Sequence, residues 1–479
     1  MHFILAKTMK YFFVIALFFY AAVTHGQTNV AVFSPEEFFA IVKKYHPLAK
    51  QAAIGIQQAQ AGILSARGGF DPLASNYLSQ KSFNGTTYYR DVNPELVIPT
   101  WYGIDIITGV ENVGGNRLDP SNTLGKSSYV GVNIPLVKNL VMDQRRADLL
   151  LARQYKQMAE VEQQAVLNNL LMDAVNAYWN WVQLYQVNVV IQNAINTNRK
   201  RFELVKKAYS YGEKPAIDTL ESFTQLQSFI FLGNDYTLQV AQAALQLSAY
   251  LWKENEVPFY LPENVQPIAQ EIVEKEIKDK PPVFVELLQN LPTTHPELLL
   301  YGQKLQALEI ERKLKFQSLL PKVDFRYNHL GKGLNILNAG KPTPFFNENY
   351  NYGLKFEMPL FLSGGRGDYK RAKLKIAETE ILQSNKSWEL ELKVKQYFNE
   401  FLNLQTQVAL QADMYANYQR LVKAEETIFF NGESSLFLIN SRENKALESL
   451  QKLVALQVKY YKTYYAIQWS AGQLGNFVP

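Results

Sequence analysis

The sequence contains no cysteine in 479 residues. This absence excludes disulfide bonds, thiolate metal sites, cysteine nucleophiles and a lipid anchor attached to cysteine. Histidine is scarce as well: beyond residue 26 only His46, His295 and His329 occur, and no two of them have the spacing of metal ligands. No combination of serine, histidine and acid indicates a nucleophile. We therefore expect neither an enzyme nor any catalytic, cofactor-binding or metal-binding residue.

The chain also lacks a strong charge of one sign and long hydrophobic runs. Its 49 Lys and Arg residues nearly balance 44 Asp and Glu residues, and no stretch resembles a basic arm that would bind nucleic acid. Beyond residue 26 no segment offers the roughly 18 consecutive apolar residues of a membrane-spanning helix. Such a chain is either soluble outside the cytoplasm or crosses a membrane as strands, which leave a much weaker hydropathy signal.

The first 26 residues have the pattern of a secretory signal. Two lysines precede the apolar run 11–23, and mostly small residues follow before Gln27. This run is shorter than the roughly 20 residues that a helix needs to span a bilayer. We therefore expect residues 1–26 to be a cleaved signal, with either Met1 or Met9 as its start.

The remainder of the chain repeats itself, since landmarks of one half recur in the same order in the other. They are His46-Pro47 and His295-Pro296, Pro72 and Pro321, Pro135 and Pro359, and Gly212 and Gly432. Landmarks in a fixed order, with the length differences confined to loops, indicate duplication of one structural unit. We assign the first repeat to residues 27–262 and the second to 263–479, which begins with a linker and a small equatorial element.

Each repeat is predicted to contain a helix of moderate length, a β-hairpin, a very long helix, a glycine-marked tip and a returning helix. The hairpins are expected at about 73–136 and 322–362, and the long helices at about 137–211 and 368–431. Neither long segment contains glycine or proline, the strongest breakers of helical order. At 1.5 Å per residue such helices reach about 100 Å, so they must lie side by side in an elongated molecule.

Two neighbouring apolar stripes run along the first long helix. One steps by three and four from Met158 to Val189, which is typical of a coiled-coil seam, and the other runs from Leu167 to Tyr185. Two adjacent stripes indicate neighbours on two sides, as in a wall of helices closed into a tube. An ordinary helical bundle with wide apolar faces is the alternative.

The clearest strand covers residues 349–358, where apolar and polar side chains alternate. A period of two is typical of a half-buried strand, and it recurs before Pro135 in the first repeat. If these strands cross a bilayer, their apolar side chains face lipid. The expected lipid-facing residues are Tyr350, Tyr352, Leu354, Phe356, Val130, Val132 and Ile134.

Two hairpins supply four strands per chain, and the segment 84–126 is interpreted as an outward loop. Because closed barrels need about eight strands or more, one chain alone cannot form one, whereas three copies would supply twelve. A small soluble β-domain on a helical stalk is the alternative.

This order of elements over residues 35–475 resembles the TolC-like outer-membrane efflux proteins. The features that carry it are the strand-to-helix exits at Pro135 and Pro359, the tips at Gly212 and Gly432, and the C-terminal segment 464–474. The resemblance implies an α+β membrane protein: a homotrimer whose twelve-stranded transmembrane β-barrel, with four strands per chain, continues into a long periplasmic α-helical barrel.

The resemblance also implies a function and a location. The chain would be a passive export duct in the outer membrane of a Gram-negative bacterium. It would work with a periplasmic adaptor and an inner-membrane pump, in a tripartite efflux pump or a type I secretion system. A soluble periplasmic coiled-coil adaptor or stalk without a pore is the competing interpretation.

In the family, polar links close the tips and acidic residues ring the opening. Asp218 matches one acidic position, whereas Leu438 and Ser441 stand at the corresponding positions of the second tip. Phe429 and Ser434 replace a tyrosine and a basic residue. We therefore expect Phe429 and Leu438 to make the closure partly apolar; the alternative is that both simply pack the tip turn.

Overall fold

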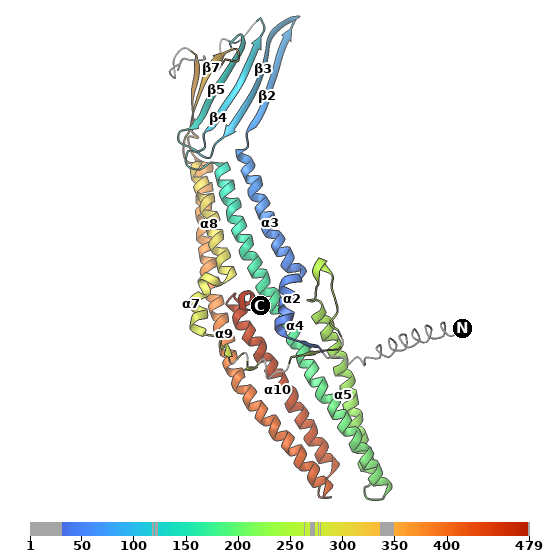
Figure 1. Cartoon of the computed structure of the whole chain (residues 1–479). Coiled ribbons are helices and arrows are strands. Elements are labelled where there is room, and N and C mark those ends of the chain that lie inside the picture. Colours follow the sequence, from blue (N-terminus) through green and yellow to red (C-terminus); the bar gives the residue numbers. More distant parts are fainter. Residues whose placement is uncertain are drawn as a thin grey trace, which may run out of the picture.

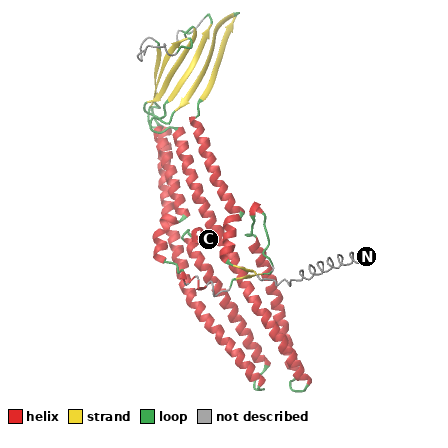
Figure 2. Cartoon of the chain, in the orientation of Figure 1, coloured by secondary structure: helices red, strands yellow, loops and turns green. Residues whose placement is uncertain are grey.

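The structure is a computed structural model that describes residues 31–477, apart from 117–118, 120–122, 263, 269–273, 276, 278 and 336–348. The predicted signal, residues 1–26, lies outside the described residues. The molecule is elongated, with a β-sheet at one end, long helices through its middle and two helical turns at the other end (Figure 1). Helices dominate and strands are confined almost entirely to the one end, so the expected α+β class is confirmed (Figure 2).

Two helices run from the sheet to the far end. Helix α4 (Gln144–Ser210) has 67 residues and α9 (Ser363–Phe430) has 68, which corresponds to about 100 Å each. Each turns back through a short loop into a shorter helix, α5 (Ala216–Ser248) or α10 (Leu436–Ser470). In the part of the chain that is described, no helix is both long enough and apolar enough to cross a membrane.

The helix that precedes the sheet is broken once in each half of the chain. The four pieces are α2 (Pro35–Tyr45), α3 (Pro47–Arg67), α7 (Phe284–Thr294) and α8 (Pro296–Gln317). We expected one continuous helix in each place, which is wrong. Proline disfavours helical geometry at the preceding residue, so His46 and His295 are extended and begin a new helix instead. Each imidazole caps that helix, because its Nδ1 accepts the N–H of Leu48 or Glu297 at 3.2 Å.

The long helices lie in one layer with two free edges. Near the sheet the order of contacts is α3, α4, α8, α9, and toward the tips it is α5, α4, α10, α9. One edge of the layer is therefore formed by α3 and α5, and the other by α9.

An aromatic core holds this layer together at mid-length. Tyr178, Trp179 and Trp181 of α4 are fully buried against α2 and α10, and the Tyr178 hydroxyl donates to the Phe33 carbonyl at 2.7 Å. These aromatic residues come from both predicted stripes of α4, so the middle of each stripe is buried within a single chain, whereas Val189 at the end of the first stripe is exposed. Beside this core, β1 (Ala31–Phe33) pairs in parallel with β6 (Val265–Pro267).

The sheet at the end of the molecule has six strands, all antiparallel to their neighbours. In spatial order they are β2 (Leu73–Phe83), β3 (Thr86–Pro99), β4 (Asp105–Gly114), β5 (Gly125–Pro135), β7 (Lys322–Lys332) and β8 (Tyr350–Glu357). The prediction of four strands per chain is wrong, because the supposed loop 84–126 contains β3 and β4. Asn84 and Gly85 both have positive φ and join β2 to β3 in a two-residue hairpin turn.

Candidate functional site: the sheet faces and the helical tips

One face of the sheet is apolar, and it carries every side chain predicted to contact lipid. The register aligns Leu354 with Phe325 and Phe325 with Ile134, so residues of β8, β7 and β5 form continuous rows across the sheet. Parallel rows contain Tyr352 with Val132 and Tyr350 with Val130. All of these residues therefore project from the same face.

This apolar face is open to its surroundings in the isolated chain. Leu354 is 63% exposed and Phe356 is 66% exposed, with Tyr352 beside them at 57%. A contiguous apolar patch of this kind marks a surface that contacts lipid or another protein.

The opposite face of the sheet is polar and internally bonded. The Tyr129 hydroxyl lies 3.1 Å from Asn93 Oδ1 and 2.9 Å from Glu95 Oε2, and an Arg326 Nη2 lies 3.4 Å from the same carboxylate. These side chains come from β5, β3 and β7, so the network crosses the intervening strands. The sheet thus separates an apolar side from a hydrated, charged side.

The predicted strand exits, Pro135 and Pro359, lie where the sheet meets the helices. Pro135 is the last residue of β5, and the next residue, Leu136, donates its N–H to the Val323 carbonyl at 2.7 Å. Pro359 lies between β8 and α9. Because proline has no N–H, it suits a position where a strand ends its ladder.

An ion-pair cluster fixes the start of α4 at this junction. Asp143 caps the helix by accepting the Arg146 N–H at 2.9 Å, and Arg145 bonds to Asp105 of β4 at 2.9 Å. Burial would raise the pKa of Asp143, but its hydrogen bonds to Arg146 and the charges of Arg146 and Arg145 together outweigh burial and hold that pKa below the usual value. The sheet and the helical layer are thereby joined through side chains at the base of β4.

The opposite end of the molecule is formed by two glycine turns. Gly212 and Gly432 have φ of +77° and +84°, and the N–H of the next residue, Glu213 or Glu433, bonds back to the preceding helix. This is the Schellman arrangement that ends α4 and α9 and reverses the chain. The predicted tip positions thus coincide with the turns.

The structure separates the two apolar tip residues. Phe429 is buried with Val205, Leu436 and Ile439, whereas Leu438 is 42% exposed. Phe429 therefore packs the tip, which is the alternative left open for it. Of these two residues Leu438 is the exposed one, and Phe430 and Phe437 beside it are exposed as well. Lys214 of the first tip lies over the Phe429 ring, 4.2 Å from its centroid.

The remaining predicted tip residues are polar and dispersed. Ser434 donates to Glu425, while Ser441 is exposed on α10. Asp218 lies in the first turn of α5 and is near Glu221. Burial, and then the Asp218 charge, raise the pKa of Glu221 above its usual value.

A buried ion-pair cluster at the tip was not predicted. Arg201 of α4 lies 2.6 Å from Glu426 of α9 and 2.7 Å from Glu443 of α10, with only 11% of its side chain exposed. Burial would lower the pKa of Arg201, but the two carboxylates outweigh it and raise that pKa. The signal was present: Arg201 follows Ala194 and Asn198 at seam spacing, and a charge on a seam needs a partner.

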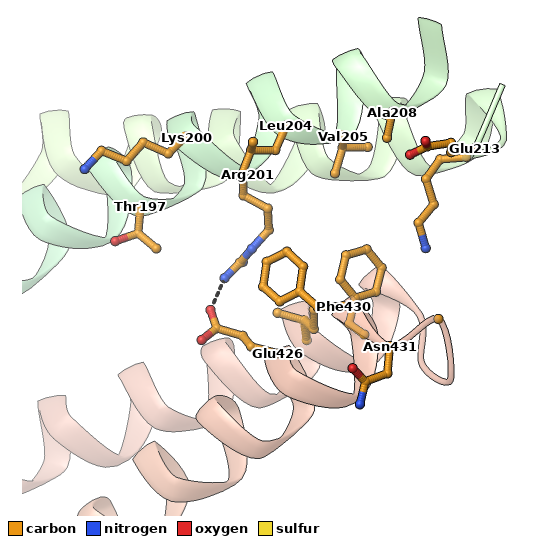
Figure 3. Close-up of a pocket in the computed structure, with 14 residues that line it drawn as sticks. Thr197, Lys200, Arg201, Leu204, Val205, Ala208, Glu213, Glu426, Phe430 and Asn431 are labelled. Atoms are coloured by element: carbon orange, nitrogen blue, oxygen red, sulfur yellow. Dashed lines mark hydrogen bonds and ion pairs between the residues drawn. The ribbon is translucent and has the colours of Figure 1, made fainter. Parts of the chain in front are cut away.

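A cavity of about 540 Å³ lies beside this cluster, between the ends of α4 and α9 (Figure 3). Arg201 reaches across it to Glu426, and Lys200 and Phe430 are among the residues that line it. The contacts between the two halves of the tip include the Arg201 cluster, the packing of Phe429 against Val205 and a hydrogen bond from Asn440 to Glu221, and the cavity lies among them. Among the described residues, no group of three or more acidic or histidine side chains could hold a metal ion.

No protein-family model and no curated protein matches the sequence. Solved outer-membrane channels, however, have the same fold over nearly the whole chain. The CmeC outer membrane channel of Campylobacter jejuni is 13% identical, with 92% of this chain and 85% of that chain covered at a TM-score of 0.62. VceC of Vibrio cholerae is 14% identical, covering 91% and 96% at 0.62, and the open MtrE channel of Neisseria gonorrhoeae is 12% identical, covering 92% and 88% at 0.61. The resemblance to TolC-like channels is therefore confirmed for the fold, which is that of the outer-membrane channel proteins.

Proposed function

We propose that this chain is a subunit of an outer-membrane export channel, a passive duct rather than an enzyme. Three copies enclose the duct, their sheets forming a barrel in the outer membrane and their helices a tube through the periplasm. The observation that carries the proposal is the pairing of a six-stranded sheet, apolar on one face and polar on the other, with a layer of helices about 100 Å long.

The free edges of the chain support a ring of subunits. Among the described residues, β2 and β8 each pair with only one other strand of the sheet, and in the helical layer α3, α5 and α9 are terminal. Unpaired strand edges do not occur in the hydrocarbon region of a membrane, so each must meet another copy. Two different edges that meet head to tail close into a ring.

Exposed apolar side chains on the terminal helices fit the same arrangement. Leu238 and Leu245 of α5 are exposed, and so are Leu374, Ile381 and Leu410 of α9. A neighbouring copy would cover both sets. The apolar stripes of α4, in contrast, are already covered at mid-length within the chain. The similarity of the two halves, each with a capping histidine, a long helix and a glycine turn, supports the proposed duplication into repeats 27–262 and 263–479.

The partners follow from the same architecture. The tips lie at the end away from the membrane, where a periplasmic adaptor and an inner-membrane pump would meet them. The pump would supply the energy. In this proposal, the predicted gate residues Asp218, Leu438 and Ser441 line or flank the aperture, and Leu438 is its apolar element.

The test compares two substitutions on neighbouring residues of β8. Arginine on a lipid-facing position near the bilayer midplane costs about 2–4 kcal/mol, whereas a lumen-facing position tolerates it. Leu354→Arg should therefore reduce the amount of oligomer in detergent-extracted outer membranes, and Gly353→Arg should not. Electron microscopy of the purified particle should show a threefold tube. A monomer that is soluble without detergent would contradict the proposal and favour the soluble stalk.

A further inference from the structure

The hairpin formed by β3 and β4 is the difference between this six-stranded chain and a subunit that contributes four strands. We propose that the hairpin is an integral part of the membrane wall, so that each subunit contributes six strands and three subunits build an eighteen-stranded barrel. The inference rests on the proposed channel function. It concerns the width of the duct and the charge of its lining, because both would differ from those of a barrel with four strands per chain.

The hydrogen-bonded ladders are the first argument. From Asp105↔Asn133 to Asn112↔Lys126, β4 pairs with β5 without interruption. On its other side β4 pairs with β3, and β3 pairs with β2 along the whole of β2, with one irregularity beyond Lys81. The hairpin therefore lies in the plane of the sheet, between β2 and β5. It does not fold over the sheet as a flap.

The second argument is that the apolar face continues across the hairpin. The register places Ile98, Ile106, Val132, Tyr327 and Tyr352 in one row that crosses five strands. If both faces of the hairpin were exposed to water, we would not expect apolar side chains to continue this row across it. The outward residues nearer the helices are likewise mostly apolar: Val92, Pro94 and Leu96 of β3, and Thr108 and Val110 of β4. Arg90 and Asn112 lie on the same face at the end of the hairpin away from the helices. The hairpin thus has the outward face that a lipid-exposed strand requires.

The third argument comes from the polar face, where Tyr129 lies across β4. Its hydroxyl reaches Asn93 and Glu95 of β3 by passing over Gly109. A Cβ at position 109 would lie 2.4 Å from that hydroxyl, so only glycine leaves room for the ring. An aromatic ring that covers a glycine of the adjacent strand is a recurrent way to fix strand register. β5 and β3 are therefore tied together through the hairpin.

The turn of the hairpin is anchored to the helical layer. Trp101 stacks on Phe70, with ring centroids 4.2 Å apart, and Asp105 bonds to Arg145 of α4 at 2.9 Å. The turn is closed by the Thr100 N–H, which bonds to the Ile104 carbonyl at 2.9 Å. Contacts of this kind hold the lower end of the hairpin at the level where the other strands meet the helices.

Strand direction permits closure with six strands. β2 follows α3 and leaves the helices, whereas β8 returns to them and leads into α9. The β8 edge of one copy can therefore pair antiparallel with the β2 edge of the next. Because barrel diameter grows roughly linearly with strand number, eighteen strands make a barrel about one and a half times as wide as twelve.

The hairpin also changes the lining of the duct. Asp91, Glu95 and Glu111 lie on the polar face, where Arg326 of β7 is the nearby cation that bonds to Glu95. Four strands per chain would lack all three carboxylates. The wider barrel is therefore also the more acidic one, and its lining would suit cationic or neutral cargo better than anionic cargo.

Disulfide trapping tests directly which strands of neighbouring subunits pair in the barrel wall. Because the sequence contains no cysteine, only the introduced cysteines can form disulfides. A disulfide forms only where Cα atoms approach to about 7 Å or less. One cysteine is placed on the edge strand β8, and the second on β2 or on β4, always on the polar face. The positions are Asn351 and Lys355 in β8, Ser75 and Ser79 in β2, and Ile107 and Glu111 in β4. Each pair is oxidised in intact outer membranes and the covalent oligomers are counted on non-reducing gels.

The proposal requires covalent trimers with β8–β2 pairs and none with β8–β4 pairs. Trimers trapped by β8–β4 pairs would mean that β2 and β3 leave the wall and that β4, β5, β7 and β8 of each copy build a twelve-stranded barrel. This overturns the inference but leaves the channel function intact. A twelve-stranded barrel of β2, β5, β7 and β8 would keep the β8–β2 pairs, and the strand count described below distinguishes it from eighteen strands. If no pair traps an oligomer and the extracted protein is monomeric, the channel function itself fails and the inference fails with it.

Image reconstruction of the detergent-purified particle gives a second, independent readout. Eighteen strands in a cross-section through the barrel support the proposal. Twelve strands in a threefold particle overturn it, again without affecting the channel function.

Discussion

Arg201 and Glu443 form a 2.7 Å ion pair that joins α4 to α10 close to the tip. Glu426 of α9 shares the same guanidinium, so one residue holds three of the four helices at this end. Removing one partner of a buried pair typically costs about 3–5 kcal/mol, because the other charge is left uncompensated. This cluster is therefore the contact whose loss should most loosen the tip.

Arg201→Gln should open the tip. Its two carboxylates would repel each other and take up water, and the ends of α4 and α9 would separate. We expect larger single-channel conductance in planar bilayers and faster hydrogen exchange over residues 197–213 and 425–443. Arg199→Gln is the matched control, since Arg199 is exposed on the same helix. Equal conductance in the two variants would contradict a role for the cluster in closure.

Gly432→Ala should weaken the second tip, while Gly302→Ala should strengthen α8. Neither position has an atom within 4 Å of an added Cβ, so the two substitutions differ only in backbone conformation. At Gly432, φ is +84°, where a side chain costs about 1 kcal/mol or more. In the helix around Gly302, alanine gains about 1 kcal/mol over glycine. Exchange rates at each site measure both effects, and a stabilised tip would contradict the expectation.

His295 should make the protein less stable in acid. Burial is the main cause that lowers the pKa of His295 to about 4, against 6.5 for an ordinary histidine. The unfolded chain then binds a proton between about pH 6.5 and 4 that the folded chain does not. This contribution to stability is complete above pH 6.5 and is lost as pH falls toward 4, by up to about 3 kcal/mol.

His295→Asn is the variant that isolates this effect, because asparagine also caps helices and does not titrate. The melting temperature of the variant should fall less between pH 7 and pH 5 than that of the wild type. His46→Asn is the control, since His46 is less buried and caps α3 in the same way. An unchanged difference between the two pH values would show that His295 is not responsible.

Gly109→Val should disrupt the sheet much more than Gly114→Val. At position 109 the new side chain collides with Tyr129 and with the Pro94 carbonyl, whereas position 114 is open. The Tyr129 bonds to Asn93 and Glu95 would break and β3 would lose its tie to β5. β3 and β4 would then become sensitive to protease. Limited proteolysis of intact membranes measures this change. Equal sensitivity of the two variants would contradict the proposed role of Gly109.

Much of the fold could be predicted from local pattern. The absence of glycine and proline from α4, and from α9 beyond Gly367, predicts two very long helices, although α4 begins at Gln144 and α9 at Ser363. The alternation from Tyr350 to Phe356 identifies β8, and Gly212 and Gly432 mark the tips. These features depend on neighbours in the sequence, so a single chain displays them. The proline landmarks that indicated repetition also mark the helix breaks, although we interpreted those segments as continuous.

The features that the sequence analysis did not predict depend on contacts between distant parts of the chain. The hairpin of β3 and β4 is rich in residues that also favour loops, and its strands are stabilised by cross-strand pairing that the sequence displays only at the Asn84-Gly85 turn. The Arg201 cluster joins residues that are far apart in the chain, so the local spacing marks Arg201 as a residue that needs a partner but does not identify Glu426 and Glu443. The fate of Phe429 was undecided for the same reason, since its partner Val205 belongs to the other half of the chain.

Helices α4 and α9 are unbroken from the base of the sheet to the tips, whereas the helices α2/α3 and α7/α8 are each interrupted by proline at mid-length. The two continuous helices therefore act as stiff rods, each with an uninterrupted hydrogen-bond ladder. A sideways force on a tip is carried along its rod to the base of the sheet, where Asp143 and its arginine partners hold α4 in place. The tips at one end of the molecule and the junction of sheet and helices at the other are thus mechanically linked.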